Sequence, residues 1–147
     1  MTEPIKSILM AAALFTGGLF IAEPAAQAQP AVSTAKPADT LGTIQTTVVK
    51  TIGADAKTVH VTSNGSVLIV ARINSPMNDT THEGRNNEAK VIAAIAAKEI
   101  GSEPKFAKVS TIRVEYSVHA APATKSKIVD SVEFRKGPDG VFDFHQT

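Results

Sequence analysis

The residues best suited to chemistry lie in one polar segment, Asn78–Asn87, which reads NDTTHEGRNN. Every residue of this segment except Gly84 carries a side-chain hydrogen-bond donor or acceptor. A helix is predicted to begin within the segment, and the first backbone N–H groups of a helix have no partner inside it. An anionic group could bind these N–H groups with the help of Arg85. We therefore predict a ligand site, for which the alternative is a solvated loop with a helix cap. The predicted ligand-binding residues are Asn78, Thr80, His82, Arg85 and Asn86.

The same segment limits the case for an enzyme. His82-Glu83 matches the first two positions of the zinc-protease sequence H-E-x-x-H, but Asn86 occupies the position of the second histidine. No phosphate-binding loop, dinucleotide-binding sequence or G-x-S-x-G turn is present, and the chain has no cysteine. We therefore expect a non-enzymatic protein with no catalytic residues, no metal and no cofactor. Two alternatives stay open. One is a small secreted hydrolase that uses His82 and Glu83, and the other is a small-ligand-binding domain with a pocket between helix and sheet.

Alternating charges on two predicted strands form a second candidate surface. Arg113 and Glu115 share one face of the first strand, and Glu133 and Arg135 share one face of the second. Cross-strand ion pairs of this kind stabilise a sheet, although exposed pairs contribute little. The structural interpretation is a solvated sheet face. The functional interpretation is a charged docking surface for a protein partner.

Composition bounds the class of partner. The 147 residues include 15 Lys and Arg and 14 Asp and Glu, so the charge is nearly balanced. A balanced chain gives no case for nucleic acid or an anionic membrane as the main partner. The absence of Trp and the single Tyr argue against a carbohydrate-stacking surface. We expect the partner to be a protein or another component of the cell envelope.

The first 28 residues have the pattern of a secretory signal peptide. Lys6 precedes a largely apolar run from Ile8 to Ala22, and Pro24 and the small-residue sequence Ala26-Gln27-Ala28 follow. The run is shorter than the roughly 20 residues that a transmembrane helix needs. We predict cleavage after Ala28, no stable membrane insertion afterwards, and a soluble product in the periplasm or the extracellular medium. Residues 29–38 are predicted to be a flexible leader, and residues 39–147 a single domain.

Hydrophobic spacing predicts two helices that position the candidate sites. The first begins at a cap, Asp39 or Thr40, and ends at Gly53. Its apolar stripe consists of Leu41, Ile44, Val48 and Ile52. The second helix covers residues 81–100, with Thr80 and Glu83 as a capping box, and Glu88 is expected to be exposed. Its buried stripe consists of Ala89, Ile92, Ala93, Ala96 and Ile100.

Strands are predicted over residues 58–62, 67–73, 110–118 and 128–135, with a last short strand that contains Phe142 and Phe144. Asn64-Gly65 is typical of the hairpin turn between the first two strands. Residues 67–71 have no polar face, so this strand should be covered on both sides or lie centrally in the sheet. In the third strand, alternation places Tyr116 and Val118 on one face and Ser117 on the other.

The order of these elements is helix, strand, strand, helix and three further strands. It predicts an α+β fold, with a mainly antiparallel sheet of about five strands and two helices on one face.

Part of the domain, Asp55 to Tyr116, resembles the BON domain of bacterial envelope proteins, which runs helix, two strands, helix, strand. The resemblance rests on the hairpin with Gly65, the apolar stretch Val67–Val70, the Ala-rich helix and the Val-rich strand after it. Asn74–Asn87 is longer than the corresponding link, Lys108-Val109 replaces a Gly-Val pair, and two extra strands follow. The resemblance implies envelope maintenance or ligand attachment, with no catalytic residues to transfer.

Overall fold

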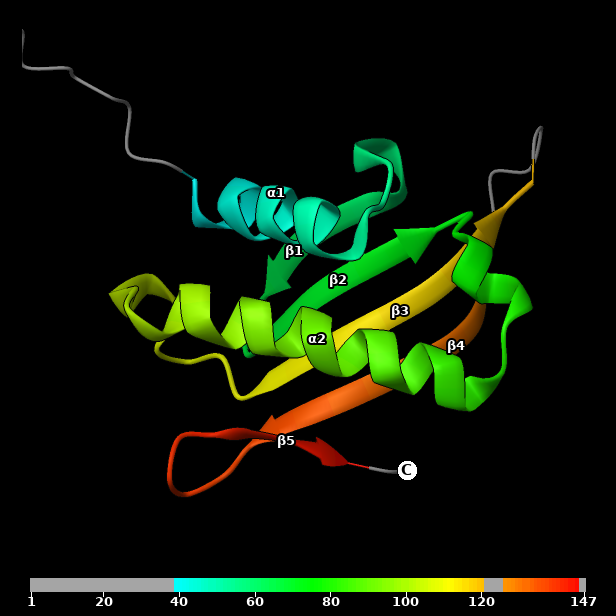
Figure 1. The fold of residues 1–147 in the computed structure, drawn as a ribbon. Helices are drawn as coiled ribbons and strands as arrows, with labels where there is room; N and C mark the ends of the chain where they lie inside the picture. The colour runs from blue at the N-terminus through cyan, green and yellow to red at the C-terminus, as the bar shows by residue number, and fades with distance from the viewer. Residues whose placement is uncertain (1–38, 121–125, 146–147) are drawn as a thin grey trace, which may run out of the picture. The chain divides into compact units, whose positions relative to one another are not determined.

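The computed structural model describes residues 39–120 and 126–145, and Figure 1 shows how their elements are arranged. The predicted signal peptide, its cleavage site and the leader lie outside the described residues. Within the described ranges, no helix is long and apolar enough to cross a membrane.

A five-stranded sheet with the strand order β1-β2-β3-β4-β5 forms the centre of the fold. The strands are β1 (Val59–Asn64), β2 (Val67–Ile73), β3 (Thr111–His119), β4 (Ser126–Lys136) and β5 (Phe142–His145). All neighbouring pairs are antiparallel except β2 and β3, which are parallel. Parallel pairing follows from the helix between these two strands, because a crossover brings the chain back to start the next strand at the same end. The predicted α+β class with a mainly antiparallel sheet is confirmed.

Two α-helices and three short 3-10 helices complete the described chain. The α-helices are α1 (Thr40–Ile52) and α2 (His82–Gly101), and the 3-10 helices are η1 (Ala56–Thr58), η2 (Pro76–Asp79) and η3 (Pro104–Phe106). Asp39 caps α1, because its side chain accepts a hydrogen bond from the N–H of Leu41. Gly53 ends α1 with a φ of 66°, a left-handed conformation that glycine adopts without steric cost.

The predicted cap of α2 was wrong by one residue. The N-cap is Thr81, whose hydroxyl accepts a hydrogen bond from the N–H of Gly84 at 3.2 Å. Thr80 instead follows η2, and its hydroxyl donates to the carbonyl of Met77 at 2.8 Å. The two threonines have the same capping chemistry. Thr80 is already the C-cap of η2, which ends at Asp79, so Thr81 is left to cap α2.

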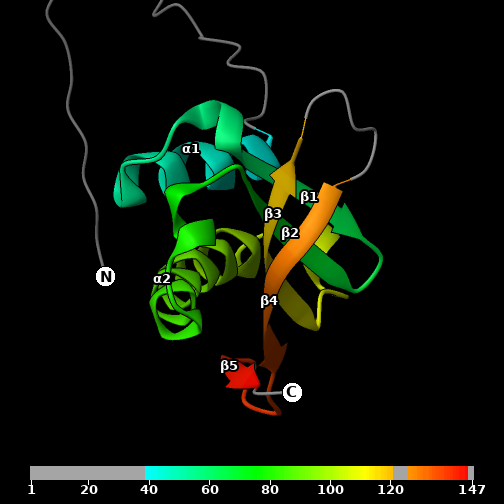
Figure 2. The same ribbon diagram turned by 90° about the vertical axis from the view of Figure 1, so that its right-hand side faces the viewer.

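One hydrophobic core joins the helices to the sheet. Ile44 and Val48 of α1 and Ile92 of α2 are fully buried with strand residues such as Leu68 and Val114. In Figure 2, α1 and α2 lie next to each other, and α1 contacts β1 while α2 contacts β3, β4 and β5. The side chains of β2 alternate between buried and half-buried. This strand is internal, between β1 and β3. One of its faces is buried and the other is half-buried.

Burial along β3 does not follow the predicted alternation after Tyr116. Ser117 is buried, whereas Val118 is 37 % exposed. The pairing of β3 with β4 shifts at the same point, because Tyr116 pairs with Asp130 and Ser117 with Ile128, which leaves Val129 of β4 without a partner in β3. The extra residue of this β-bulge therefore belongs to β4.

Candidate functional site

A polar cluster forms where the start of α2 meets β4, and Asp130 lies at its centre. Asp130 pairs with Tyr116 across the sheet, and its carboxylate lies among groups from α2. Oδ2 of Asp130 accepts hydrogen bonds from Nδ1 of His82 and from Nε of Arg85, both at 2.7 Å. Burial opposes ionisation of Asp130, but the hydrogen bonds from Arg85 and His82 outweigh it and lower the pKa of this carboxyl.

Arg85 connects the cluster to the preceding loop. Its Nη1 points to the backbone carbonyls of Met77, Asn78 and Thr80. The side chain of Arg85 is only 11 % exposed, and its charge is balanced by Asp130. The guanidinium that was expected to attract an anion therefore fastens the loop to the sheet.

Two other predicted ligand-binding residues, Asn78 and Thr80, also contact the fold itself. Asn78 donates from Nδ2 to the carbonyl of Ser117 at 2.9 Å, and Thr80 ends η2. The side-chain oxygens of Asn78 and Asn86 are buried and have no hydrogen-bond partner among the described residues. His82 also contacts the fold, through Asp130, although its side chain is 56 % exposed. The structure thus brings His82 and Arg85 together at Asp130.

A second, more deeply buried network lies beside the first. Arg72 of β2 has a side chain that is 5 % exposed, and its Nε donates to Oε1 of Glu88 on α2 at 3.0 Å. Its two terminal nitrogens donate to the hydroxyls of Thr58 and Ser75 at 3.1 and 2.9 Å. The expectation that Glu88 is exposed was wrong, since its side chain is 13 % exposed. A buried arginine requires a buried carboxylate to balance its charge.

Tyr116 lies between the two networks. Burial and then the nearby charge of Glu88 raise the pKa of Tyr116 far above its ordinary value, so the hydroxyl stays protonated. It donates a hydrogen bond to the backbone carbonyl of Arg85 at 2.9 Å. The sequence analysis did not identify Arg72, Tyr116 or Asp130 as members of a polar network.

The chemistry open to the Asp130 cluster is that of a histidine oriented by a carboxylate. Such a pair can act as a general base when a nucleophilic hydroxyl lies next to the free ring nitrogen. Among the described residues, His82 makes no hydrogen bond to a serine or threonine hydroxyl. Within the same part of the chain, no three His, Asp or Glu side chains are grouped so that they could hold a metal ion.

The charged residues predicted on the sheet are brought together by the strand register. Arg113 of β3 lies opposite Glu133 of β4, with 2.6 Å between Nη2 and Oε1. Glu115 lies 3.6 Å from Arg113, and Arg135 lies 3.5 Å from Glu133. The Arg113 guanidinium, against the smaller effect of burial, holds the pKa of Glu133 below its usual range. The four residues form one ion-pair cluster.

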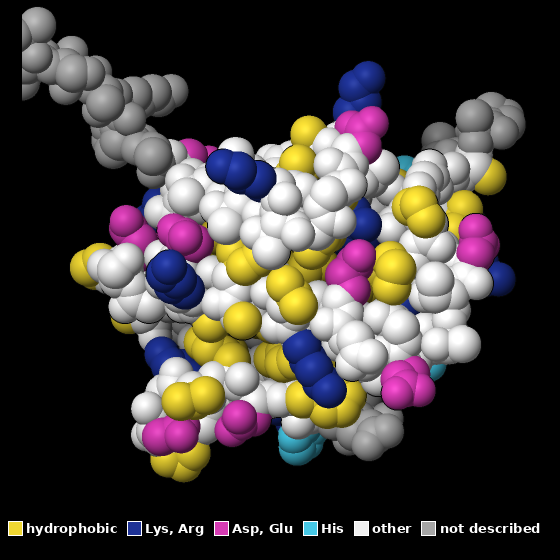
Figure 3. All heavy atoms as spheres, viewed as in Figure 1, with side chains coloured by type: hydrophobic (Ala, Val, Ile, Leu, Met, Phe, Trp, Pro, Cys, Tyr) yellow, Lys and Arg dark blue, Asp and Glu magenta, His cyan; other side chains and the backbone are white. Residues whose placement is uncertain are grey.

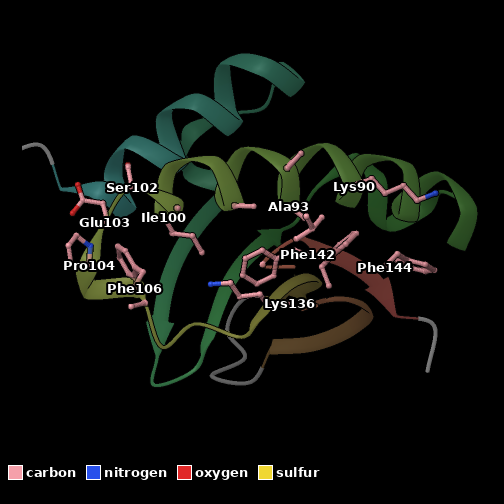
Figure 4. Close-up of a pocket in the computed structure, with 17 residues that line it drawn as sticks. Lys90, Ala93, Ile100, Ser102, Glu103, Pro104, Phe106, Lys136, Phe142 and Phe144 are labelled. Atoms are coloured by element: carbon pink, nitrogen blue, oxygen red, sulfur yellow. The ribbon is translucent and has the colours of Figure 1, made fainter. Parts of the chain in front are cut away.

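An apolar groove with a volume of about 790 Å³ lies between α2, η3 and the β4–β5 hairpin. In the space-filling view, hydrophobic atoms line the hollow between α2 and this hairpin (Figure 3). Alanines of α2 form one wall, and four phenylalanine rings contribute to the lining: Phe106, Phe134, Phe142 and Phe144. Figure 4 shows these elements around the groove, with Lys136 beside Phe142 and with Lys90 and Phe144 at one end.

The groove is the feature that sequence reasoning placed least well. A pocket between helix and sheet was only one of the alternatives, and no residue was predicted to line it. The available signal was the alternation of Phe142 and Phe144 in a short strand, together with the alanines of α2. Together they place large rings opposite side chains too small to cover them.

No protein-family model matches this chain, and no curated protein matches it in sequence. What the molecule does is therefore inferred from its own residues.

Proposed function

We propose that this protein is an exported, soluble, non-enzymatic binding module that takes a small apolar ligand in the groove between α2 and β5. The observation that carries the proposal is the groove itself. Its volume of about 790 Å³ falls within the range of roughly 300–1,000 Å³ that is usual for small-molecule sites. Its lining is mostly apolar, with few charged groups, as in sites that bind by burying hydrophobic surface.

The position of the groove supports binding over catalysis. Among the residues that the structure describes, the charged ones that line it are Lys90, Lys136 and Glu103, and neither His82 nor Asp130 does so. A ligand in the groove would therefore contact aromatic and aliphatic side chains, and not the histidine–carboxylate pair. Ser102 and Glu103 are at the η3 end, with no histidine among the lining residues to act as a general base.

The binding experiment uses a neutral fluorescent probe, Nile red, whose emission rises in apolar surroundings. Ala97 is half-buried in the α2 wall of the groove, so Ala97→Phe should fill the groove and abolish the fluorescence increase. Val91→Phe is the matched control, because Val91 is 43 % exposed on the same helix and does not line the groove. Melting curves of both variants establish that they fold. Equal Nile red binding by the two folded variants, or none by the native protein, would contradict the proposal.

Export and envelope location are part of the same proposal. They are supported by the signal-peptide pattern in the first 28 residues and by the resemblance of Asp55–Tyr116 to the BON domain. Together these features favour a ligand-attaching role in the periplasm or the extracellular medium. We propose further that both helices cover one face of the sheet, which among the described residues leaves the other face open to a partner.

A second candidate function is docking of a protein or envelope component on that open face. It is favoured by the ion-pair cluster of Arg113, Glu115, Glu133 and Arg135, which lies next to half-buried Ile69 in the register of β2 and β3. Reversal of both arginines, Arg113→Glu with Arg135→Glu, should abolish complementation of a deletion strain. His82→Ala should complement fully. The opposite result with folded variants would contradict docking here and favour the hydrolase alternative at His82.

A further inference from the structure

We infer that the groove selects a single-chain amphiphile with an anionic head group, of which a medium-chain carboxylate is the simplest case. The inference rests on the proposed function, since it names the ligand of the same groove. Two lysines of the lining carry it. Nζ of Lys136 lies 5.8 Å from the ring centroid of Phe142, and Nζ of Lys90 lies 5.7 Å from that of Phe144.

Neither lysine is neutralised by a neighbouring acid. Among residues 39–120 and 126–145, every ion pair within 4.0 Å involves an arginine or His82, and none involves Lys90 or Lys136. The aromatic faces attract these ammonium groups, but they do not cancel the charge. The groove therefore presents positive charge beside an apolar lining.

This combination discriminates between head groups. A neutral apolar ligand that fills the groove buries apolar surface but gives the exposed ammonium groups no counter-charge. A cationic amphiphile is repelled by them. An anionic head group supplies the missing charge as the chain buries its apolar surface, so both parts of the ligand gain.

The distribution of charge along the groove also orients the ligand. In Figure 4, Lys90 and Phe144 lie at one end, Glu103 and Pro104 lie at the other, and Lys136 lies between them. The end of α2 nearest Glu103 carries the partial negative charge of the helix C-terminus. The head group therefore belongs away from Glu103, next to the ammonium group of Lys90 at the Phe144 end or next to that of Lys136 beside Phe142. Ile100 follows Lys90 by ten positions in α2, which corresponds to a length of about 15 Å along the helix.

The test compares three ligands with the same ten-carbon chain by calorimetry: decanoate, 1-decanol and decyltrimethylammonium, each below its micelle concentration. We expect decanoate to bind at least about tenfold more tightly than the alcohol, and the cation to bind most weakly. The affinity for decanoate should fall as salt is raised, whereas the affinity for the alcohol should not fall.

Variants identify the groups responsible. Lys136→Gln and Lys90→Gln are made separately, and the variant that lacks the lysine next to the head group should weaken decanoate binding about five- to tenfold. Binding of 1-decanol should change by less than about twofold. Lys98→Gln is the matched control, because Lys98 is exposed on α2 and does not line the groove.

The outcomes separate this inference from the proposed function. Equal affinities for all three ligands, or unchanged decanoate binding in both lysine variants, would overturn the inference and leave an unselective apolar site. No binding of any ligand, together with no binding of Nile red, would overturn the proposed function as well.

Discussion

Removing the carboxylate of Glu88 should strongly destabilise the protein, because its side chain is only 13 % exposed and pairs with buried Arg72. In Glu88→Ala, the guanidinium of Arg72 keeps only its two hydrogen bonds to the hydroxyls of Thr58 and Ser75. Both partners are neutral. The Arg72 side chain is 5 % exposed, so hydration of its guanidinium cannot compensate for the loss of the carboxylate. Breaking a buried ion pair from one side costs about 3–5 kcal/mol. That is a large share of the roughly 5–15 kcal/mol by which a domain is stable.

Urea unfolding of the purified protein measures this loss directly. The control is Asn87→Ala, since Asn87 is the exposed neighbour of Glu88 in α2, and its free energy of unfolding should change by less than about 0.5 kcal/mol. A double variant, Arg72→Met with Glu88→Leu, should be less destabilised than Glu88→Ala alone, because it removes both charges together. If Glu88→Ala is as mild as Asn87→Ala, the Arg72–Glu88 pair is not buried in solution and the reasoning fails.

Three further predictions concern the loss of stability at acid pH, the hydrophobic core and the mature N-terminus. The lowered pKa of Asp130 contributes stability that is present above the unfolded carboxyl value of about 3.9 and is lost as the pH falls through the folded value. Asp130→Asn should therefore flatten the decline of the melting temperature below about pH 4, and an unchanged acid limb would contradict the role of this carboxylate. Ile92→Asp should unfold the domain, since Ile92 is fully buried and an unpaired carboxylate there costs several kcal/mol; a native circular dichroism spectrum would show that α2 packs differently. Exported protein should begin at Gln29 by N-terminal sequencing, and a retained Met1 would refute cleavage.

The repetitive parts of the fold could be predicted because the chain marks them locally. Helical spacing of Ile44 and Val48 located α1, and both side chains are fully buried. The hairpin between β1 and β2 was predicted, but its turn lies one residue later than Asn64-Gly65. Asn64 ends β1 and pairs with Val67, so the turn residues are Gly65 and Ser66. Gly65 supplies the positive φ of 60° that few other residues tolerate. The N-cap of α2 was misplaced because Thr80 and Thr81 are chemically identical candidates. The register shift between β3 and β4 at Tyr116 could not be predicted, because no residue type near it is specific to a β-bulge.

The polar networks could be predicted only in part, because their partners are far apart in the chain. Arg72 occupies a position on the same face of β2 as Leu68 and Val70, and Asp130 shares a face of β4 with Val132 and Phe134. A charge among buried positions indicates that a partner is buried with it. The partner's identity is not local: Glu88 is 16 residues from Arg72, and Arg85 is 45 residues from Asp130. Only the parallel crossover through α2 brings each pair together.

The groove is a consequence of the small side chains along α2. Ala89 and Ala96 are fully buried and Ala93 nearly so, which lets the helix approach the sheet closely. The next alanines around the helix, Ala94 and Ala97, instead face the short strand β5, where the rings of Phe142 and Phe144 stay only half-buried. A leucine in place of either alanine would cover those rings and extend the core. The same alanine-rich sequence that identifies a packed helix thus leaves one side of it unfilled, next to Lys90 and Lys136. Substituting Ala94 with leucine should therefore stabilise the domain while it weakens binding, the opposing changes expected when a site is kept open at the expense of packing.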